Sequence, residues 1–177
     1  MVGLLWAAAV VLGAAGLSKL ARPASTVHAL KAARIPGARI IASTAAVRVA
    51  GAAELAVAGY VLGWGGPSAA ALLGVCYLIL TVVARRMLRV SPGQDCGCFG
   101  RSSEPITRWH LLVDIAGLAI GIAATIWPQP SVVAEVTDQG AQGVLVVGLS
   151  FVLAWLGYLL MTALPALGAL RAKVANR

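Results

Sequence analysis

Five long apolar stretches constrain the fold of this chain more than any other feature. They cover residues 2–20, 45–64, 68–90, 109–127 and 143–164. A helix that crosses the hydrocarbon core of a bilayer needs about 20 consecutive, mainly apolar residues. Charged residues make up only 11% of the chain, too few to cover the surface of a soluble globule. The sequence therefore predicts an all-α, polytopic integral membrane protein in contact with the lipid bilayer.

Positive charge alternates from one connection to the next. Basic residues follow the first stretch, flank the connection between the third and fourth, and end the chain. The turn at 65–67 carries no charge, and residues 128–142 carry only Glu135 and Asp138. Because Lys and Arg concentrate in cytoplasmic loops, we expect the N-terminus outside and the 91–108 connection and C-terminus in the cytoplasm. The net charge of +8 is thus assigned to orientation and headgroup contact, not to nucleic acid.

Local signals predict the ends of the helices. Pro23 stops or kinks the first one, and residues 26–33 fit a short amphipathic helix on the membrane surface. Thr107 suits the N-cap of the fourth helix. Four tryptophans fall near the ends of the stretches and are expected to form interfacial belts. They are Trp6, Trp64, Trp109 and Trp127.

The connection between the third and fourth stretches holds the most distinctive chemistry. Its segment Asp95-Cys96-Gly97-Cys98-Phe99-Gly100 places two thiols one residue apart. The thiolate is the nucleophilic form, and the nearby Arg101 and Arg108 favour it. A disulfide closed across one residue is strained and easily reduced. The pair is therefore better suited to thiol–disulfide exchange than to holding the chain together.

Two other interpretations of the cysteine pair stay open. In a metal site, Asp95 and His110 or a second copy of the pair would have to complete the usual four ligands. The thiols can also be unreactive parts of a tight turn. On the cytoplasmic side a lasting disulfide would be unusual, whereas a transient one fits. Cys76, deep in the third stretch, is predicted to be a packing residue.

Three ionisable side chains within the apolar stretches are candidates for function: Glu54, His110 and Asp114. Glu54 is near the middle of the second, where a carboxylate is costly and therefore a functional candidate. It can transfer protons, contact a quinone-type ligand, pair with a base on a neighbouring helix, or serve as a hydrogen-bonded packing group. Arg48 lies on a different helix face. His110 and Asp114, four residues apart, share a face, so a proton relay and a structural pair are both open.

Three segments together resemble the MauE/DoxX-like membrane proteins, specifically the MauE family. They are Gly16-Leu17-Ser18-Lys19-Leu20 with Arg22-Pro23, then Glu54-Leu55, and then the segment from Asp95 to Gly100. The resemblance covers about residues 1–127. It implies a four-helix membrane core over residues 1–130, followed over 131–177 by an additional transmembrane helix and a basic tail. The family often carries an amide early in the fourth helix, where this chain has Asp114.

The resemblance implies a membrane component of thiol–disulfide handling. The founding member is required for maturation of a disulfide-rich methylamine dehydrogenase, alongside a thioredoxin-like partner. Cys96 and Cys98 are accordingly the candidate redox pair, exchanging disulfides with a thioredoxin-like protein or a disulfide-containing client. Electrons would leave to a quinone or a second thiol protein, with Glu54, His110 and Asp114 as candidate proton-handling groups. The alternatives are a non-enzymatic scaffold or assembly factor and a small transporter or metal-handling protein.

Overall fold

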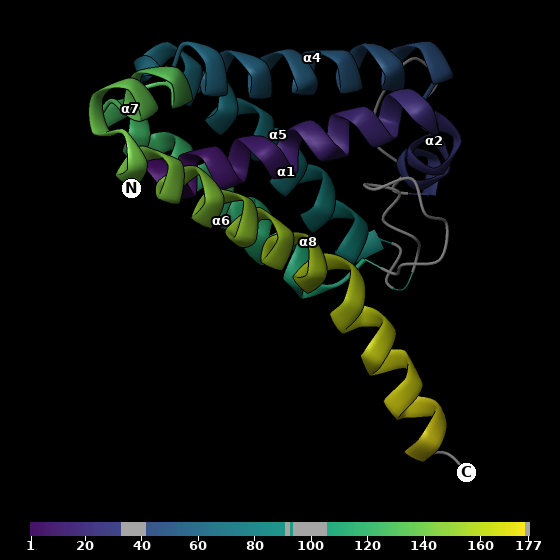
Figure 1. Cartoon of the computed structure of the whole chain (residues 1–177). Helices are drawn as coiled ribbons and strands as arrows, with labels where there is room; N and C mark the ends of the chain where they lie inside the picture. The colour runs from purple at the N-terminus through teal and green to yellow at the C-terminus, as the bar shows by residue number, and fades with distance from the viewer. Residues whose placement is uncertain (33–41, 91–92, 94–105, 176–177) are drawn as a thin grey trace.

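The computed structural model describes residues 1–32, 42–90, 93 and 106–175. Within these ranges the chain is helical and contains no β-strand (Figure 1). The helices are α1 (Val2–Ala21), α2 (Pro23–Ala32), α4 (Thr44–Gly63), α5 (Gly66–Val90), α6 (Arg108–Ile126), α7 (Val132–Gln139) and α8 (Ala141–Ala175).

Five of these helices are long and apolar enough to cross a membrane. They are α1, α4, α5, α6 and the Ala141–Leu164 part of α8. Each agrees with one predicted stretch to within two residues at either end. The predicted all-α, multi-pass membrane fold is therefore confirmed.

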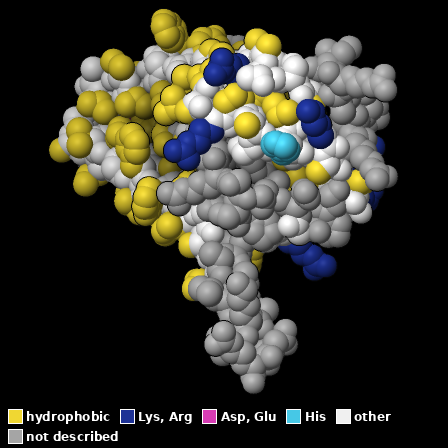
Figure 2. Space-filling model, turned by 90° about the vertical axis from the view of Figure 1, so that its right-hand side faces the viewer, with side chains coloured by type: hydrophobic (Ala, Val, Ile, Leu, Met, Phe, Trp, Pro, Cys, Tyr) yellow, Lys and Arg dark blue, Asp and Glu magenta, His cyan; other side chains and the backbone are white. Residues whose placement is uncertain are grey.

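The helices run back and forth, so the bundle has two ends. The α7 end holds Met1, the turn between α4 and α5, and α7, which carries Glu135 and Asp138. The α2 end holds α2, the start of α4, the end of α5 and the start of α6. Figure 2 looks onto the α2 end, where Lys and Arg side chains gather and the described atoms show no acidic group. The two ends thus differ in charge as the sequence predicts.

Four of the helices pack closely in two pairs, with glycines at the points of contact. Helix α1 packs mainly against α4, and α5 mainly against α6. In the α1/α4 pair, a Cβ on Gly16 would lie 2.6 Å from the backbone oxygen of Gly51. In the α5/α6 pair, a Cβ on Gly121 would lie 2.7 Å from the Cα of Gly74. Small residues at such contacts let membrane helices approach closely, because van der Waals packing holds them together.

The main core lies between the two pairs, and Trp6 is part of it. Trp6 is only 1% exposed, so its predicted place in an interfacial belt is wrong. It shares the inward face of α1 with Leu5, Ala9 and Leu12, all of them core residues. Trp64, Trp109 and Trp127 are 78%, 45% and 61% exposed, as the belt prediction requires.

Helix α2 covers the α2 end of the bundle. It begins at Pro23, in the first helical position, where a missing N–H costs nothing. Its buried residues Val27 and Ala29 face the bundle, and the helix packs against α1, α4 and α5. The predicted short helix therefore exists, and its inner side is covered by protein. Thr107 is the N-cap of α6, as predicted.

Helices α7 and α8 form a hairpin that returns along α1. Gly140, with a φ of 55°, separates the two helices. Gly143 lies so close to α7 that a Cβ there would be 2.6 Å from the Glu135 backbone oxygen. Helix α8 then packs against α1 and α6 and continues past the other helices (Figure 1). The fifth span is thus attached to the four-helix core chiefly through α1.

Candidate functional site

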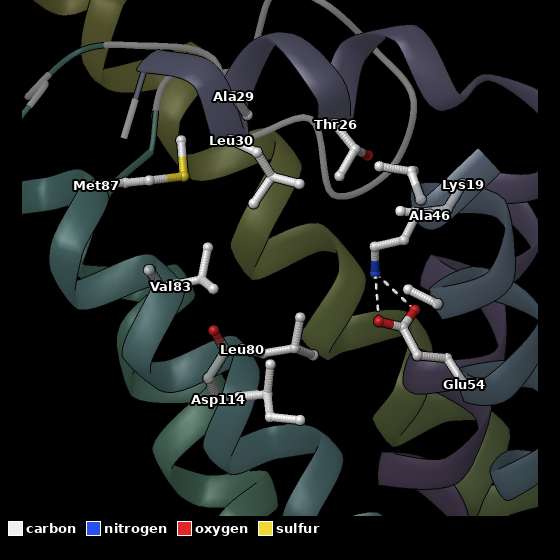
Figure 3. Close-up of a pocket in the computed structure, with 14 residues that line it drawn as sticks. Lys19, Thr26, Ala29, Leu30, Ala46, Glu54, Leu80, Val83, Met87 and Asp114 are labelled. Carbon is white, nitrogen blue, oxygen red and sulfur yellow. Dashed lines mark hydrogen bonds and ion pairs between the residues drawn. The ribbon is translucent and has the colours of Figure 1, made fainter. Parts of the chain in front are cut away.

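A buried ion pair joins α1 to α4 in the interior of the bundle. The Nζ atom of Lys19 lies 2.7 Å from Oε1 of Glu54 and 2.6 Å from Oε2 (Figure 3). The two residues are 5% and 8% exposed. Each charge compensates the other, which is how a bundle interior holds ionised groups away from water. Of the roles left open for Glu54, the structure shows pairing with a base on a neighbouring helix.

The antiparallel packing of α1 and α4 brings these side chains together. In any α-helix the Cα–Cβ bond tilts toward the N-terminus. Lys19, near the C-terminal end of α1, therefore leans inward from the α2 end. Glu54, in the middle of α4, leans toward the N-terminus of its own helix, which is the α2 end. The two side chains lean toward one another and meet below the surface.

A glycine in each helix makes room for the charged residue of the other. A Cβ on Gly51 would lie 2.9 Å from the Cβ of Lys19, and one on Gly16 would lie 3.1 Å from the Cβ of Glu54. In both helices the charged residue follows its glycine by three positions. From the sequence alone, Lys19 is only one of the basic residues near the end of the first apolar stretch, so its pairing with Glu54 is not predicted. The repeated Gly-x-x-charge spacing is the signal that could have found it.

A cavity of about 170 Å³ lies beside the ion pair, between the two helix pairs and under α2. Most of its walls are apolar, and three ionisable groups reach it from α1, α4 and α6. It is lined by Lys19, Thr26, Ala29, Leu30, Ala46, Val47, Ala50, Glu54, Ile79, Leu80, Val83, Ala84, Met87 and Asp114. We call it the main cavity.

Asp114 approaches the main cavity from the side opposite the ion pair (Figure 3). The residue is 8% exposed and belongs to α6. Within the described part of the chain, its carboxyl group makes no hydrogen bond and no ion pair within 4 Å. The cavity therefore holds one compensated carboxylate, Glu54, and one carboxyl that is available to a ligand or to a proton.

His110 supports the start of α6. Its Nδ1 accepts a hydrogen bond from the backbone N–H of Thr107 at 3.3 Å and lies 3.1 Å from Thr107 Oγ1. This contact satisfies an N–H at the helix N-terminus, as in a capping box. His110 shares an inward face with Asp114, as predicted, but the structure places no hydrogen bond between them. The structure thus shows His110 as a helix cap with Thr107, a role different from the structural pair with Asp114 that the sequence left open.

A second, smaller cavity connects these groups. It measures about 20 Å³, room for about one water molecule. Lys19, His110 and Asp114 line it together with Tyr77, whose hydroxyl donates to the Ala8 carbonyl at 2.8 Å. Because Lys19 and Asp114 line both cavities, the polar groups of α1, α4 and α6 form one cluster.

Cys96 and Cys98 lie outside the described residues, as does Asp95. The connection that carries them leaves α5 after Val90 and enters α6 at Arg108, both at the α2 end. Cys76 is a free, half-buried thiol packed against the main core, in agreement with its prediction as a packing residue. Among the residues that the structure describes, no three His, Cys, Asp or Glu side chains group as metal ligands would.

One protein family matches the amino-acid sequence over most of its length. The family is described as methylamine utilisation protein MauE, and the match covers residues 1–128. The chain belongs to the MauE family. It is therefore a multi-pass membrane protein of a family associated with methylamine utilisation. No curated protein and no solved structure matches the chain.

The MauE match includes α1 to α6, and with them the ion pair, the main cavity and the cysteine connection. Helices α7 and α8 lie beyond it. Two of the three segments that resemble the family, the one around Lys19 and the one at Glu54, meet in a single site. The third, from Asp95 to Gly100, is outside the described residues.

Proposed function

We propose that this MauE-family protein exchanges disulfides at the membrane through Cys96 and Cys98. Its partner would be a thioredoxin-like protein or a disulfide-containing client, as in maturation of enzymes of the methylamine dehydrogenase type. The observation that carries the proposal is the Cys96-Gly97-Cys98 segment, which lies inside the family match and between two membrane helices. Two thiols separated by one glycine, the residue with the fewest backbone restrictions, favour exchange over a lasting cross-link.

The exchange balances in two steps. One thiolate attacks the partner's disulfide and forms a mixed disulfide, releasing one partner thiolate. The second cysteine then attacks the mixed disulfide, so the pair becomes oxidised and the partner gains two electrons and two protons. The reverse sequence oxidises the partner. Arg108, the first residue of α6, and the N-terminus of that helix supply positive charge close to the connection, which favours the thiolate.

The polar cluster under α2 supports a role in handling the protons of this reaction. Thiol oxidation releases protons, and a carboxyl without a hydrogen bond can take one up. Asp114 is such a carboxyl among the described residues, and it follows the cysteine connection closely in sequence. Glu54 and His110 belong to the same cluster through the two cavities that share Lys19 and Asp114.

The test is substitution of each cysteine in the full chain. We expect Cys96→Ser and Cys98→Ser each to abolish formation of correct disulfides in the client, read by thiol alkylation and gel mobility. Cys76→Ser is the matched control and should leave the client unchanged. Membrane fractionation checks that every variant inserts. Normal client disulfides in both single variants and in the double variant would refute exchange and favour a scaffold.

The side of the membrane is tested separately. The charge distribution favours a cytoplasmic connection, with the N-terminus outside. In a Cys76→Ser background, a membrane-impermeant maleimide should then label Cys96 and Cys98 only after permeabilisation. Labelling of intact cells, with or without prior reduction, would place the connection outside and overturn the orientation.

A further inference from the structure

We propose that the main cavity binds the ring of a lipid-soluble quinone. The inference deepens the proposed function, since it names the chemical class that takes electrons from the thiol pair. The site itself is built only from described residues of α1, α2, α4, α5 and α6. It rests on four observations: the volume of the cavity, its charge, its donors and its opening.

The volume fits a single six-membered ring. A cavity of about 150 Å³ with apolar walls accommodates benzene, and the main cavity measures about 170 Å³. Leu30, Val83 and Met87 supply apolar wall on the α2 and α5 sides, where they face the cavity (Figure 3). A quinone ring has two apolar faces that suit such walls. A phosphate headgroup has no apolar surface to match them.

The charges favour a neutral ligand. Lys19 is already compensated by Glu54, so an incoming carboxylate or phosphate would meet no spare positive charge. It would also be repelled by the Glu54 carboxylate and by Asp114 when that group is ionised. Fatty acids and phospholipid headgroups are therefore disfavoured. A neutral molecule with hydrogen-bond acceptors meets no such penalty.

The cavity presents donors where a carbonyl oxygen would need them. The ammonium group of Lys19 has three N–H donors, and the two oxygens of Glu54 accept two of them. The third is available within the described structure. Asp114, on the opposite side, can donate in its protonated form. Two donors on opposite sides of one ring-sized cavity match the two opposed carbonyls of a quinone.

The opening leads toward lipid. Ala50 of α4 and Ile79 of α5 line the cavity, and both are exposed on the outside of the bundle, Ile79 by 58%. They belong to different helix pairs, so the cavity opens along the seam between the pairs. A ligand dissolved in the bilayer can therefore enter sideways, with its isoprenoid tail left in the seam.

The electron count agrees with the proposed exchange. Oxidation of two thiols to a disulfide releases two electrons and two protons, and a quinone that takes up both becomes a quinol. Asp114 lines the cavity, where it can pass a proton to a ring oxygen.

The binding test uses the purified full chain in lipid nanodiscs and a benzoquinone with a decyl tail, measured by calorimetric titration. Val83→Phe should fill the cavity and weaken binding about tenfold or more. Val82→Phe is the matched control, because Val82 is the neighbouring residue and 58% exposed, outside the cavity lining. We expect its affinity to equal that of the unmodified chain. Absence of saturable binding to the unmodified chain, or equal affinity in both variants, would overturn the proposal.

A second measurement does not depend on any variant folding. A photoreactive benzoquinone added to the unmodified chain should cross-link to peptides that line the cavity, which belong to α1, α2, α4, α5 and α6. Cross-links confined to peptides that do not line the cavity, such as those of α7 and α8, or a co-purified phospholipid that the quinone cannot displace, would contradict the site. A Cys96→Ser/Cys98→Ser double variant should still bind the quinone. The two proposals are therefore tested independently. Loss of quinone binding would not refute disulfide exchange, and absence of disulfide exchange would not refute quinone binding.

Discussion

Removal of one partner of the Lys19–Glu54 pair tests the interior of this bundle most directly. At 2.7 Å, and with the effective dielectric constant of about 20 that suits buried protein sites, the two charges attract by roughly 6 kcal/mol. Desolvation of the two groups, several kcal/mol for each, offsets much of this gain. The pair as a whole therefore contributes little net stability, whereas a single unpaired charge is strongly unfavourable.

The expected pattern follows from that difference. Lys19→Met leaves the Glu54 carboxylate buried and unpaired, and should lower the free energy of unfolding by about 3–5 kcal/mol. For a chain of this length, that corresponds to a fall in Tm of roughly 6–20 °C. The double variant Lys19→Met/Glu54→Leu replaces the pair with apolar groups of similar size. The double variant should recover most of the lost stability, so that its free energy of unfolding is within about 2 kcal/mol of that of the unmodified chain.

The assay is reversible unfolding in mixed micelles with a rising fraction of a denaturing detergent, followed by circular dichroism. Arg48→Met, on the same helix as Glu54 but exposed, controls for loss of a basic residue. The reasoning fails if the free energy of unfolding of Lys19→Met is within about 1 kcal/mol of that of the unmodified chain. It also fails if the double variant is no more stable than Lys19→Met alone or Glu54→Leu alone. Either result would mean that the two charges are not energetically coupled.

Two further predictions concern the helix contacts and the cap. Gly16→Ala places a Cβ 2.6 Å from the Gly51 oxygen and should destabilise the chain by about 1–3 kcal/mol, whereas Gly59→Ala, with nothing within 4 Å, should change thermal stability little or raise it. Equal melting temperatures for the two variants would refute close packing of α1 and α4. His110→Ala should cost about 1 kcal/mol by removing the acceptor for the Thr107 N–H, and His110→Gln should restore most of it. A Gln variant as unstable as the Ala variant in the same thermal assay would show that the cap is not the source of the effect.

The transmembrane helices could be predicted because their signal is local. An uninterrupted apolar stretch has to cross the bilayer as a helix, so length and composition decide the spans. Pro23 and Thr107 act within one turn, and the structure confirms both. Cys76 behaves as a small apolar residue in a core, also a local expectation.

The site depends on packing between helices, which a single stretch does not show. Lys19 is two residues from the C-terminal end of α1, a normal place for a basic residue, and only the approach of α4 turns it into a partner of Glu54. Trp6 lies close enough to a helix end to suggest an interface, but the inward face of α1 decides its burial. The main cavity exists because two glycine-joined pairs meet less closely than the helices within each pair, which no residue spacing predicts.

The position of the ion pair also has a consequence for membrane insertion. A charged residue at the centre of a helix costs about 2.5–3.5 kcal/mol when that helix enters the bilayer alone. Lys19 escapes this cost at first, since from the end of α1 its long side chain can reach the headgroups. Glu54, in the middle of α4, has no such route. We therefore expect α1 to insert without help, and α4 to insert stably only once Lys19 is there to receive its carboxylate.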